Sequence, residues 1–135
     1  MKKESKELYK QKNIDWLKAK AAEPGVYPLG KGVYYSVIAD GDKSGRMANA
    51  GSVVTVRYEG RTIDGKVFDA DMEGTPPAFR LRDLIPGWII ALQKMHPGSR
   101  WEIYIPAEQG YGKQSIPGIP GNSTLIFDIE LIAVN

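Results

Sequence analysis

The chain has 135 residues, of which 42% are hydrophobic and 25% charged, as expected for a single soluble globular domain. Its net charge of +2 is too small to indicate binding to nucleic acid, and the absence of cysteine excludes disulfides and thiolate nucleophiles. No apolar run approaches the roughly 18 residues that span a bilayer, so no transmembrane segment is predicted.

The first predicted element is a helix over residues 4–22, which ends before Pro24. One of its faces carries the apolar side chains Tyr9, Ile14, Trp16 and Leu17. This face could pack on the rest of the chain or on a second copy, and packing within the chain is favoured. Lysines mixed with acids indicate that the remaining surface faces solvent: Lys2, Lys3, Lys6, Lys10, Lys12, Lys18 and Lys20 with Glu4, Glu7 and Asp15.

The rest of the chain alternates apolar runs with turn residues, which predicts a sheet. Val54, Val56 and Tyr58 recur at every second position, which is typical of a strand with one buried side. Asp64-Gly65 has the sequence of a tight hairpin turn. The predicted strands cover residues 33–38, 52–58, 61–63, 66–68, 79–81, 100–105 and 123–134.

A short helix is predicted over residues 86–95. Pro86 suits a first helical turn, and Ile89 and Leu92 have helical spacing. A long loop, residues 106–122, then leads to the last strand. One helix covering one face of an antiparallel sheet, after a separate N-terminal helix, makes an α+β fold.

Several kinds of reactive site are missing from the sequence. The only histidine, His96, follows the short helix in a turn and lacks the partners of a catalytic triad. Asp69, Asp71 and Glu73 alternate, but they are an incomplete ligand set for a calcium loop. With no phosphate-binding loop either, neither a metal site nor a cofactor is predicted.

Aromatic side chains are the remaining candidates for a site. From their spacing alone they could equally be core residues. Two polar features favour a pocket: the hydroxyls of Tyr58 and Tyr111 need partners if buried, and Asp69 would be costly in a core without water. An apolar lining with a few polar tips is the usual form of a small-ligand site. The six aromatic residues are Tyr58, Phe68, Phe79, Trp88, Tyr111 and Phe127.

Several motifs, in order and with fitting spacing, resemble those of FKBP-type peptidyl-prolyl cis-trans isomerases. Residues 56–60 and 64–69 resemble the opening signature, and residues 79–81 and 84–88 the central one. Residues 105–112 and 119–131 are similar to the two ends of the long flap loop and the closing strand. The resemblance divides the chain into an N-terminal helical extension, 1–31, similar to those of bacterial members, and an isomerase domain, 32–135.

This resemblance implies an antiparallel half-barrel of five to six strands wrapped around the short helix, and an isomerase that needs no cofactor. Trp88 would form the floor of the pocket, while the Tyr111 hydroxyl and the Ile85 N–H would hold substrate carbonyls. The residues implied for catalysis are Tyr58, Phe68, Asp69, Trp88, Tyr111 and Phe127. Those implied for substrate binding are Leu84, Ile85, Ile119 and Pro77.

Three departures from the family pattern affect expected affinity and sequence preference. Pro77 stands at a pocket-lip position that is often aromatic, and Gly121 stands where a second proline is usual. Residues 113–118 also differ from the commonest flap sequence.

The expected partners are proline-containing polypeptides and macrolide inhibitors, with no nucleic acid. A homodimer through the N-terminal helix is an expected assembly. An alternative function is a chaperone or scaffold that binds proline segments with little turnover. Residues 1–30 lack the apolar middle of a secretory signal. The expected compartment is the bacterial periplasm or cell envelope if an export signal was removed, and otherwise the cytoplasm.

Overall fold

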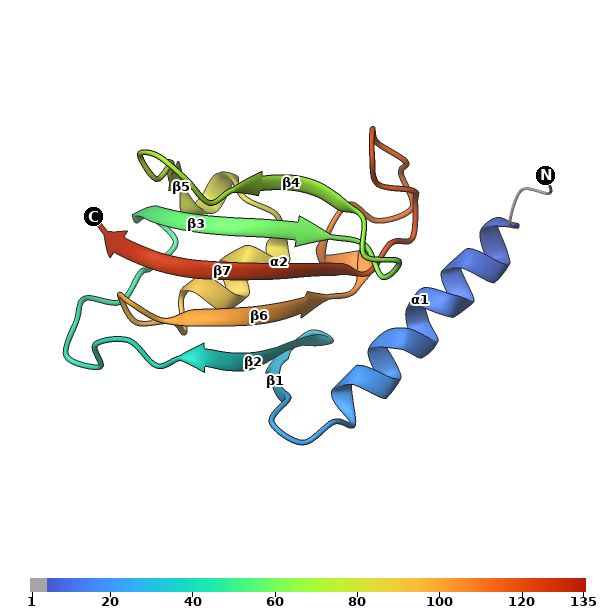
Figure 1. Ribbon diagram of the computed structural model, residues 1–135, viewed down its shortest axis with the longest axis horizontal. Coiled ribbons are helices and arrows are strands. Elements are labelled where there is room, and N and C mark those ends of the chain that lie inside the picture. The colour runs from blue at the N-terminus through green and yellow to red at the C-terminus, as the bar shows by residue number, and fades with distance from the viewer. Residues whose placement is uncertain (1–4) are drawn as a thin grey trace.

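The computed structural model describes residues 5–135 and has two α-helices and one antiparallel sheet (Figure 1). This arrangement confirms the α+β fold. Position 4 of the predicted helix, with Lys2, Lys3 and Glu4 of the charge pattern, lies outside the described residues. The helices are α1 (Lys6–Ala21) and α2 (Pro86–Leu92). The strands are β1 (Tyr27–Gly30), β2 (Val33–Ala39), β3 (Val53–Arg61), β4 (Val67–Asp71), β5 (Ala78–Arg80), β6 (Arg100–Ile105) and β7 (Leu125–Val134).

The sheet has seven strands in the order β1-β2-β6-β7-β3-β4, with β5 paired to β3 beside β4. Every pairing is antiparallel. The long strands β3 and β7 form the centre and pair from Val54–Val134 to Arg61–Ile126, with a shift of register between Thr55 and Val56. Strand β1 was not predicted, and it extends the sheet to Tyr27 within the segment assigned to the N-terminal extension.

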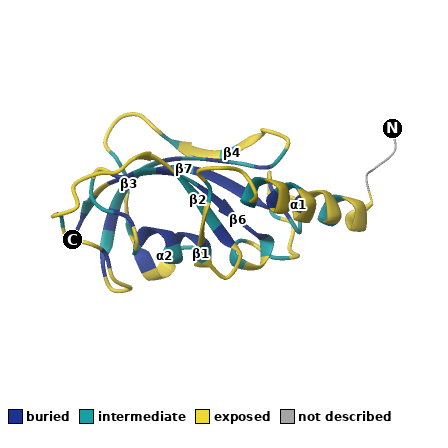
Figure 2. Ribbon diagram, turned by 90° about the horizontal axis from the view of Figure 1, so that it is seen from below, coloured by how far each residue is buried: buried dark blue, intermediate teal, exposed yellow. Residues whose placement is uncertain are grey.

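One face of the sheet packs around α2, as Figure 2 shows from below. In β3 the residues Val54, Val56 and Tyr58 are buried, as their spacing predicts. Every second residue of β7 from Leu125 to Leu131 joins them, and α2 contributes Trp88 and Leu92. A Cβ at Gly87 would lie 2.6 Å from the Ile105 side chain, so glycine lets α2 approach β6 closely.

The opposite face of the sheet is covered at one end by α1. Leu17 packs with Tyr104 of β6 and Ile126 of β7, both of which point away from α2. Helix α1 therefore packs on its own chain. The apolar face predicted for this helix is only partly used, because Ile14 remains 46% exposed, while Asn13 is almost completely buried.

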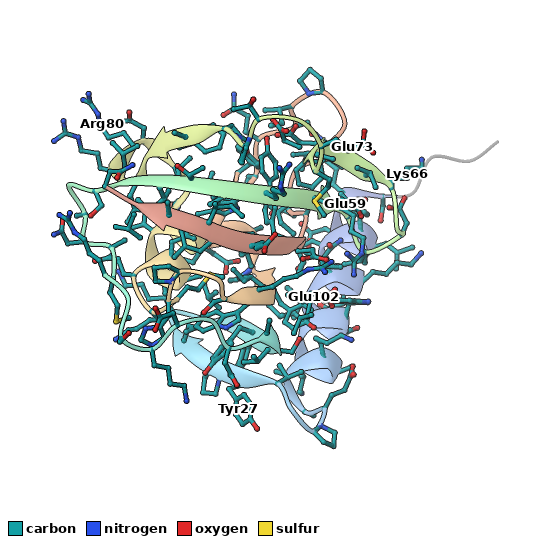
Figure 3. All side chains as sticks on the ribbon, turned by 60° about the vertical axis from the view of Figure 1, so that its left-hand side comes forward. Tyr27, Glu59, Lys66, Glu73, Arg80 and Glu102 are labelled. Carbon is teal, nitrogen blue, oxygen red and sulfur yellow. The ribbon has the colours of Figure 1, made fainter. Side chains whose placement is uncertain are left out.

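The uncovered part of this face carries paired charges. Arg100 of β6 makes two hydrogen bonds with Asp128 of β7, at 2.9 and 2.7 Å. Glu102, labelled in Figure 3, accepts hydrogen bonds from Arg61 at 3.0 Å and from the Tyr104 hydroxyl at 2.8 Å. Arg100 and Asp128 are diagonal neighbours on adjacent strands, whereas Arg61 of β3 reaches across β7 to Glu102. Both pairs satisfy charge on a face that solvent reaches.

Candidate functional site

Aromatic side chains from four elements line a cavity of about 250 Å³ on the α2 side of the sheet. Tyr58 comes from β3, Phe68 from β4, Trp88 from α2 and Phe127 from β7. The structure thus brings together residues that lie up to 69 positions apart, as the pocket hypothesis requires. The full lining is Tyr58, Phe68, Asp69, Phe79, Asp83, Leu84, Ile85, Trp88, Tyr111 and Phe127.

The rings contact one another edge to face. Trp88 lies 5.2 Å from Tyr58 and 5.1 Å from Phe127 between ring centroids, at interplanar angles of 80° and 89°. Phe68 meets Phe127 in the same way, at 5.5 Å and 88°. Such contacts add stability beyond the area that they bury, and they hold each ring in one orientation. The cavity therefore has rigid apolar walls.

Gly60 of β3 allows two of these rings to take their places. A Cβ at this position would lie 2.5 Å from the Phe127 ring and 2.7 Å from the Phe68 ring. Both distances are shorter than carbon atoms tolerate, so no larger residue fits without moving a ring. The sequence carried a signal for this role, because a glycine inside a strand often marks a close approach.

The polar edge of the pocket centres on one hydrogen bond. The Tyr58 hydroxyl donates to Asp69 Oδ2 at 2.9 Å, which answers the expectation that both polar groups need partners. Burial raises the pKa of Tyr58, and the hydrogen bond to Asp69 and its charge raise it further. Tyr58 therefore remains a neutral donor at physiological pH.

Two donors on the rim lack protein acceptors. The Tyr111 hydroxyl and the Ile85 N–H make no hydrogen bond within residues 5–135. Burial raises the pKa of Tyr111, and the charge of Asp69 contributes, so this hydroxyl also keeps its proton. Below them, the Trp88 indole Nε1 is buried without a partner among the same residues. Free donors around an apolar cavity suit a ligand that carries carbonyl oxygens.

Two residues expected at the site lie outside the cavity lining. Ile119 is 4% exposed and packs in the main core, where it pairs with Ile116 in an isolated bridge. Pro77 lies just before β5, and its carbonyl accepts a hydrogen bond from the Val56 N–H at 3.1 Å.

Conversely, Phe79 and Asp83 line the cavity although neither is among the site residues that the family resemblance implies. Phe79 contacts Trp88 edge to face at 6.3 Å, and it was among the aromatic candidates. Asp83 lies in the short 3-10 helix Leu81–Asp83 before α2. Its only signal was its position in front of Leu84 and Ile85.

Another cavity, of about 340 Å³, lies between α1 and the start of the long loop. Its walls include Ile14, Leu17, Pro106 and Ala107, with Lys10 at its edge. Although this cavity is larger, Tyr34 is the one aromatic residue in its lining, so it lacks the ring cluster. The aromatic cavity is therefore the better candidate for the site.

Other sites receive no support from the described part of the chain. Between residues 5 and 135, no group of three or more His, Asp and Glu side chains is arranged to hold a metal ion. The same residues include no helix that is long and apolar enough to cross a membrane.

Comparisons with known proteins identify the same family as the motifs. The sequence model of the FKBP-type peptidyl-prolyl cis-trans isomerase family matches residues 44–132. The chain is 43% identical to the peptidyl-prolyl cis-trans isomerase Mip of Coxiella burnetii over 126 residues, which are 92% of this chain and 54% of that protein. It is 42% identical to the outer membrane protein MIP of Legionella longbeachae over 127 residues, 93% of this chain and 54% of that protein.

A solved structure extends the similarity to three dimensions. The crystal structure of a peptidyl-prolyl cis-trans isomerase from Pseudomonas syringae superposes with a TM-score of 0.90 at 35% identity, covering 100% of this chain and 99% of that one. The chain spans about half the length of the two curated relatives. With the family motifs, the fold and the aromatic cavity in agreement, the chain belongs to the FKBP-type peptidyl-prolyl cis-trans isomerase family.

Proposed function

We propose that the chain accelerates cis–trans rotation of Xaa–Pro bonds in proline-containing polypeptides and thereby assists protein folding. The observation that carries the proposal is the cavity of edge-to-face rings around Trp88, with free donors on its rim. The proline ring would lie on Trp88, between Tyr58, Phe68 and Phe127. At about 250 Å³ the cavity is near the lower end of the size of small-ligand pockets, which suits a proline ring and a neighbouring group.

The proposed mechanism needs no covalent step. Rotation about the peptide C–N bond has a barrier of about 18–20 kcal/mol, because the planar amide is stabilised by resonance. The twisted amide has lost this resonance and is less polar than the planar form. A cavity with apolar walls therefore penalises the planar state more than the twisted one, and so lowers the barrier between them.

Positioning supplies the second contribution. The rigid rings would hold the proline while the preceding carbonyl rotates, and the Tyr111 hydroxyl and Ile85 N–H would hold substrate carbonyls. Asp69 would fix the orientation of Tyr58 through their hydrogen bond at 2.9 Å. A useful isomerase needs to lower the barrier by only about 5–8 kcal/mol, which these effects can provide without an acid, a base or a metal.

The deciding experiment measures isomerisation of a proline tetrapeptide by the wild type and by two polar variants. Asp69→Asn and Tyr111→Phe are each expected to lower kcat/KM by about tenfold, equivalent to about 1.4 kcal/mol, while the melting temperature changes little. Asp15→Asn is the control, because Asp15 lies on α1 away from the cavity. Full turnover in both polar variants would contradict the site assignment.

The same peptide separates catalysis from binding alone. If the chain were a chaperone or scaffold for proline segments, it would bind the peptide measurably while the rotation of the peptide bond stayed at the uncatalysed rate. Isothermal titration with the assay peptide gives the affinity, and the assay gives the rate. A macrolide such as rapamycin is expected to compete for the same cavity and to abolish both signals.

Assembly and location follow as further proposals. Leu8 and Ile14 of α1 are 51% and 46% exposed, which supports the expected homodimer through this helix. Sedimentation of the wild type and of Leu8→Ala tests this dimer.

The name of the Legionella relative supports a location in the cell envelope, and fractionation of cells that express the natural gene tests it.

A further inference from the structure

Helix α1 contacts the long loop through polar groups as well as the sheet through apolar ones. We call residues 106–122 the flap loop. Asn13 of α1 is 1% exposed, and its Oδ1 accepts a hydrogen bond from the Thr124 N–H at 2.7 Å, just after this loop. The Thr124 hydroxyl returns a hydrogen bond to the Asn13 carbonyl at 3.3 Å, and Asn13 Nδ2 donates to the Tyr9 carbonyl at 2.8 Å.

A second contact lies one helical turn away. The hydroxyls of Tyr9 and Ser123 are 2.7 Å apart, and the Ser123 hydroxyl donates to the Pro120 carbonyl at 2.5 Å. Since Ser123 uses its only proton on Pro120, Tyr9 is the donor to Ser123. Ser123 is 3% exposed, so its hydroxyl is shielded from water, and this chain of bonds ends inside the flap loop.

Hydrogen bonds within the flap loop continue from this end to the catalytic rim. The Asn122 N–H donates to the Gly112 carbonyl at 2.8 Å, and the Gly112 N–H donates to the Ala107 carbonyl at 2.8 Å. Tyr111, whose hydroxyl faces the aromatic cavity, lies directly before Gly112. A displacement at residues 122–124 would therefore be passed to the backbone that carries Tyr111.

Close packing leaves no room for a side chain at one position of the flap loop. A Cβ at Gly121 would lie 2.1 Å from the Lys113 carbonyl oxygen, and the Gly121 N–H donates to Ser115 Oγ at 2.9 Å. The two halves of the loop are thus in direct contact. The departure from the family pattern at Gly121 fits this contact, because proline has no N–H and would collide with Lys113.

We propose that Asn13 and Tyr9 are positioning residues of the isomerase, which fix the flap loop so that Tyr111 is held at the rim of the cavity. The proposal rests on the proposed function, since it assigns a role in the same reaction. The N-terminal helix then belongs to the catalytic unit. Because an apolar residue would anchor α1 equally well, a buried amide that accepts from the Thr124 N–H is better explained by orientation than by attachment.

The test compares two variants that weaken the docking of α1 at different points. Asn13→Ala removes the side-chain bonds to the Thr124 N–H and the Tyr9 carbonyl, but it keeps the backbone carbonyl that accepts from the Thr124 hydroxyl. Leu17→Ala removes the apolar contact with Tyr104 and Ile126 and leaves the flap contacts intact. Asn13→Ala is expected to lower kcat/KM by about fivefold at a temperature where it is fully folded. Leu17→Ala, the matched control, is expected to lose melting temperature while its kcat/KM equals that of the wild type.

Tyr9→Phe keeps the ring and removes only one hydrogen bond, so it serves as a variant that remains folded. Its expected loss of kcat/KM is about twofold, and its effect is not additive with that of Asn13→Ala. Amide NMR gives a readout independent of turnover. In Asn13→Ala and Tyr9→Phe, the two flap-side variants, the amide resonances of Tyr111 and Gly112 are expected to shift and their protons to exchange faster with solvent. Neither change is expected in Leu17→Ala.

Two results would overturn the proposal: wild-type kcat/KM and unchanged Tyr111 and Gly112 amides in both flap-side variants, or equal effects of Leu17→Ala on the rate and on these amides. Failure of the proposed function looks different. In that case the wild type itself shows no turnover, while the amide shifts still report whether α1 positions the flap loop.

Discussion

The core that carries the aromatic cavity and the α1 contact lie on opposite faces of β6 and β7, and they are built from different chemistry. Toward α2, β6 and β7 present Ile103, Ile105 and Phe127 to a core of rings and aliphatic side chains. Toward α1, they present Tyr104 and Ile126 to a contact that depends equally on hydrogen bonds. A strong apolar pattern in the sequence therefore identifies the cavity, whereas the docking of a helix can depend on one buried amide, here that of Asn13.

The largest expected effect concerns the floor of the cavity. Trp88→Ala removes a ring that touches Tyr58, Phe79 and Phe127, and such deletions cost about 3–5 kcal/mol of unfolding free energy. Turnover and stability are therefore expected to fall together, in urea denaturation and in the peptide assay. If Trp88→Ala lost turnover alone, the ring would not belong to the core, and the contrast between the two faces would be weaker than described.

A smaller effect is expected when the rings are moved rather than removed. Gly60→Ala places a methyl group against Phe68 and Phe127, and such overpacking costs about 1–3 kcal/mol. Loss of turnover is expected to exceed that of a surface control, Gly51→Ala, whose Cβ would meet only the Asn49 side chain at 3.4 Å. Wild-type turnover in Gly60→Ala would show that the precise places of the two rings do not matter.

The smallest expected effect is a pH dependence of the stability that Tyr104 contributes on the α1 face of the sheet. Burial raises the pKa of Tyr104 to about 12 from 10.0, so the folded state keeps the proton that the unfolded chain loses. Its contribution to stability is therefore complete below pH 10 and is lost as the pH rises toward 12. Tyr104→Phe cannot ionise there and also lacks the bonds to Glu102 and Ser36.

Urea denaturation at pH 8 and near pH 11 measures this contribution. The variant is expected to be less stable than the wild type at pH 8, and the gap is expected to narrow in alkali. A gap that stays constant would mean that Tyr104 ionises equally in the folded and unfolded chains.

Much of the sheet could be predicted because its strands have one buried face. The alternation of Val54, Val56 and Tyr58 reports that face directly. Strand β1 was missed because it is short, mostly exposed and contains Pro28, so it has no alternation to detect. The last strand was predicted to start at residue 123, two residues early. Ser123 and Thr124 bond to α1 rather than to a neighbouring strand.

The site was predictable where aromatic residues carried it and less so where backbone geometry did. Tyr58, Trp88 and Phe127 meet at one cavity as the motifs implied. The flap contact was invisible, since an asparagine inside a helix normally indicates solvent and nothing local marks Asn13 as buried. Its partner, Thr124, lies 111 residues away, a separation that no sequence pattern reports.

The division of the chain at residue 31 stays a prediction, and the structure refines how to test it. Strand β1 pairs with β2, so a truncation that removes Tyr27–Gly30 also exposes the β2 edge. Removal of residues 1–22 alone leaves the sheet complete. If the positioning role is correct, that shorter chain is expected to fold and to isomerise peptides more slowly.

The short strands at the two margins of the sheet have a consequence for solubility. An open sheet risks adding strands from neighbouring molecules along its unpaired edges. Here one margin is the four-residue β1, where Pro28 supplies no N–H, and the other is the five-residue β4, which carries Asp69 and Asp71. Neither margin offers a long neutral row of backbone groups. The fold can therefore keep its sheet open around a binding cavity without inviting intermolecular pairing.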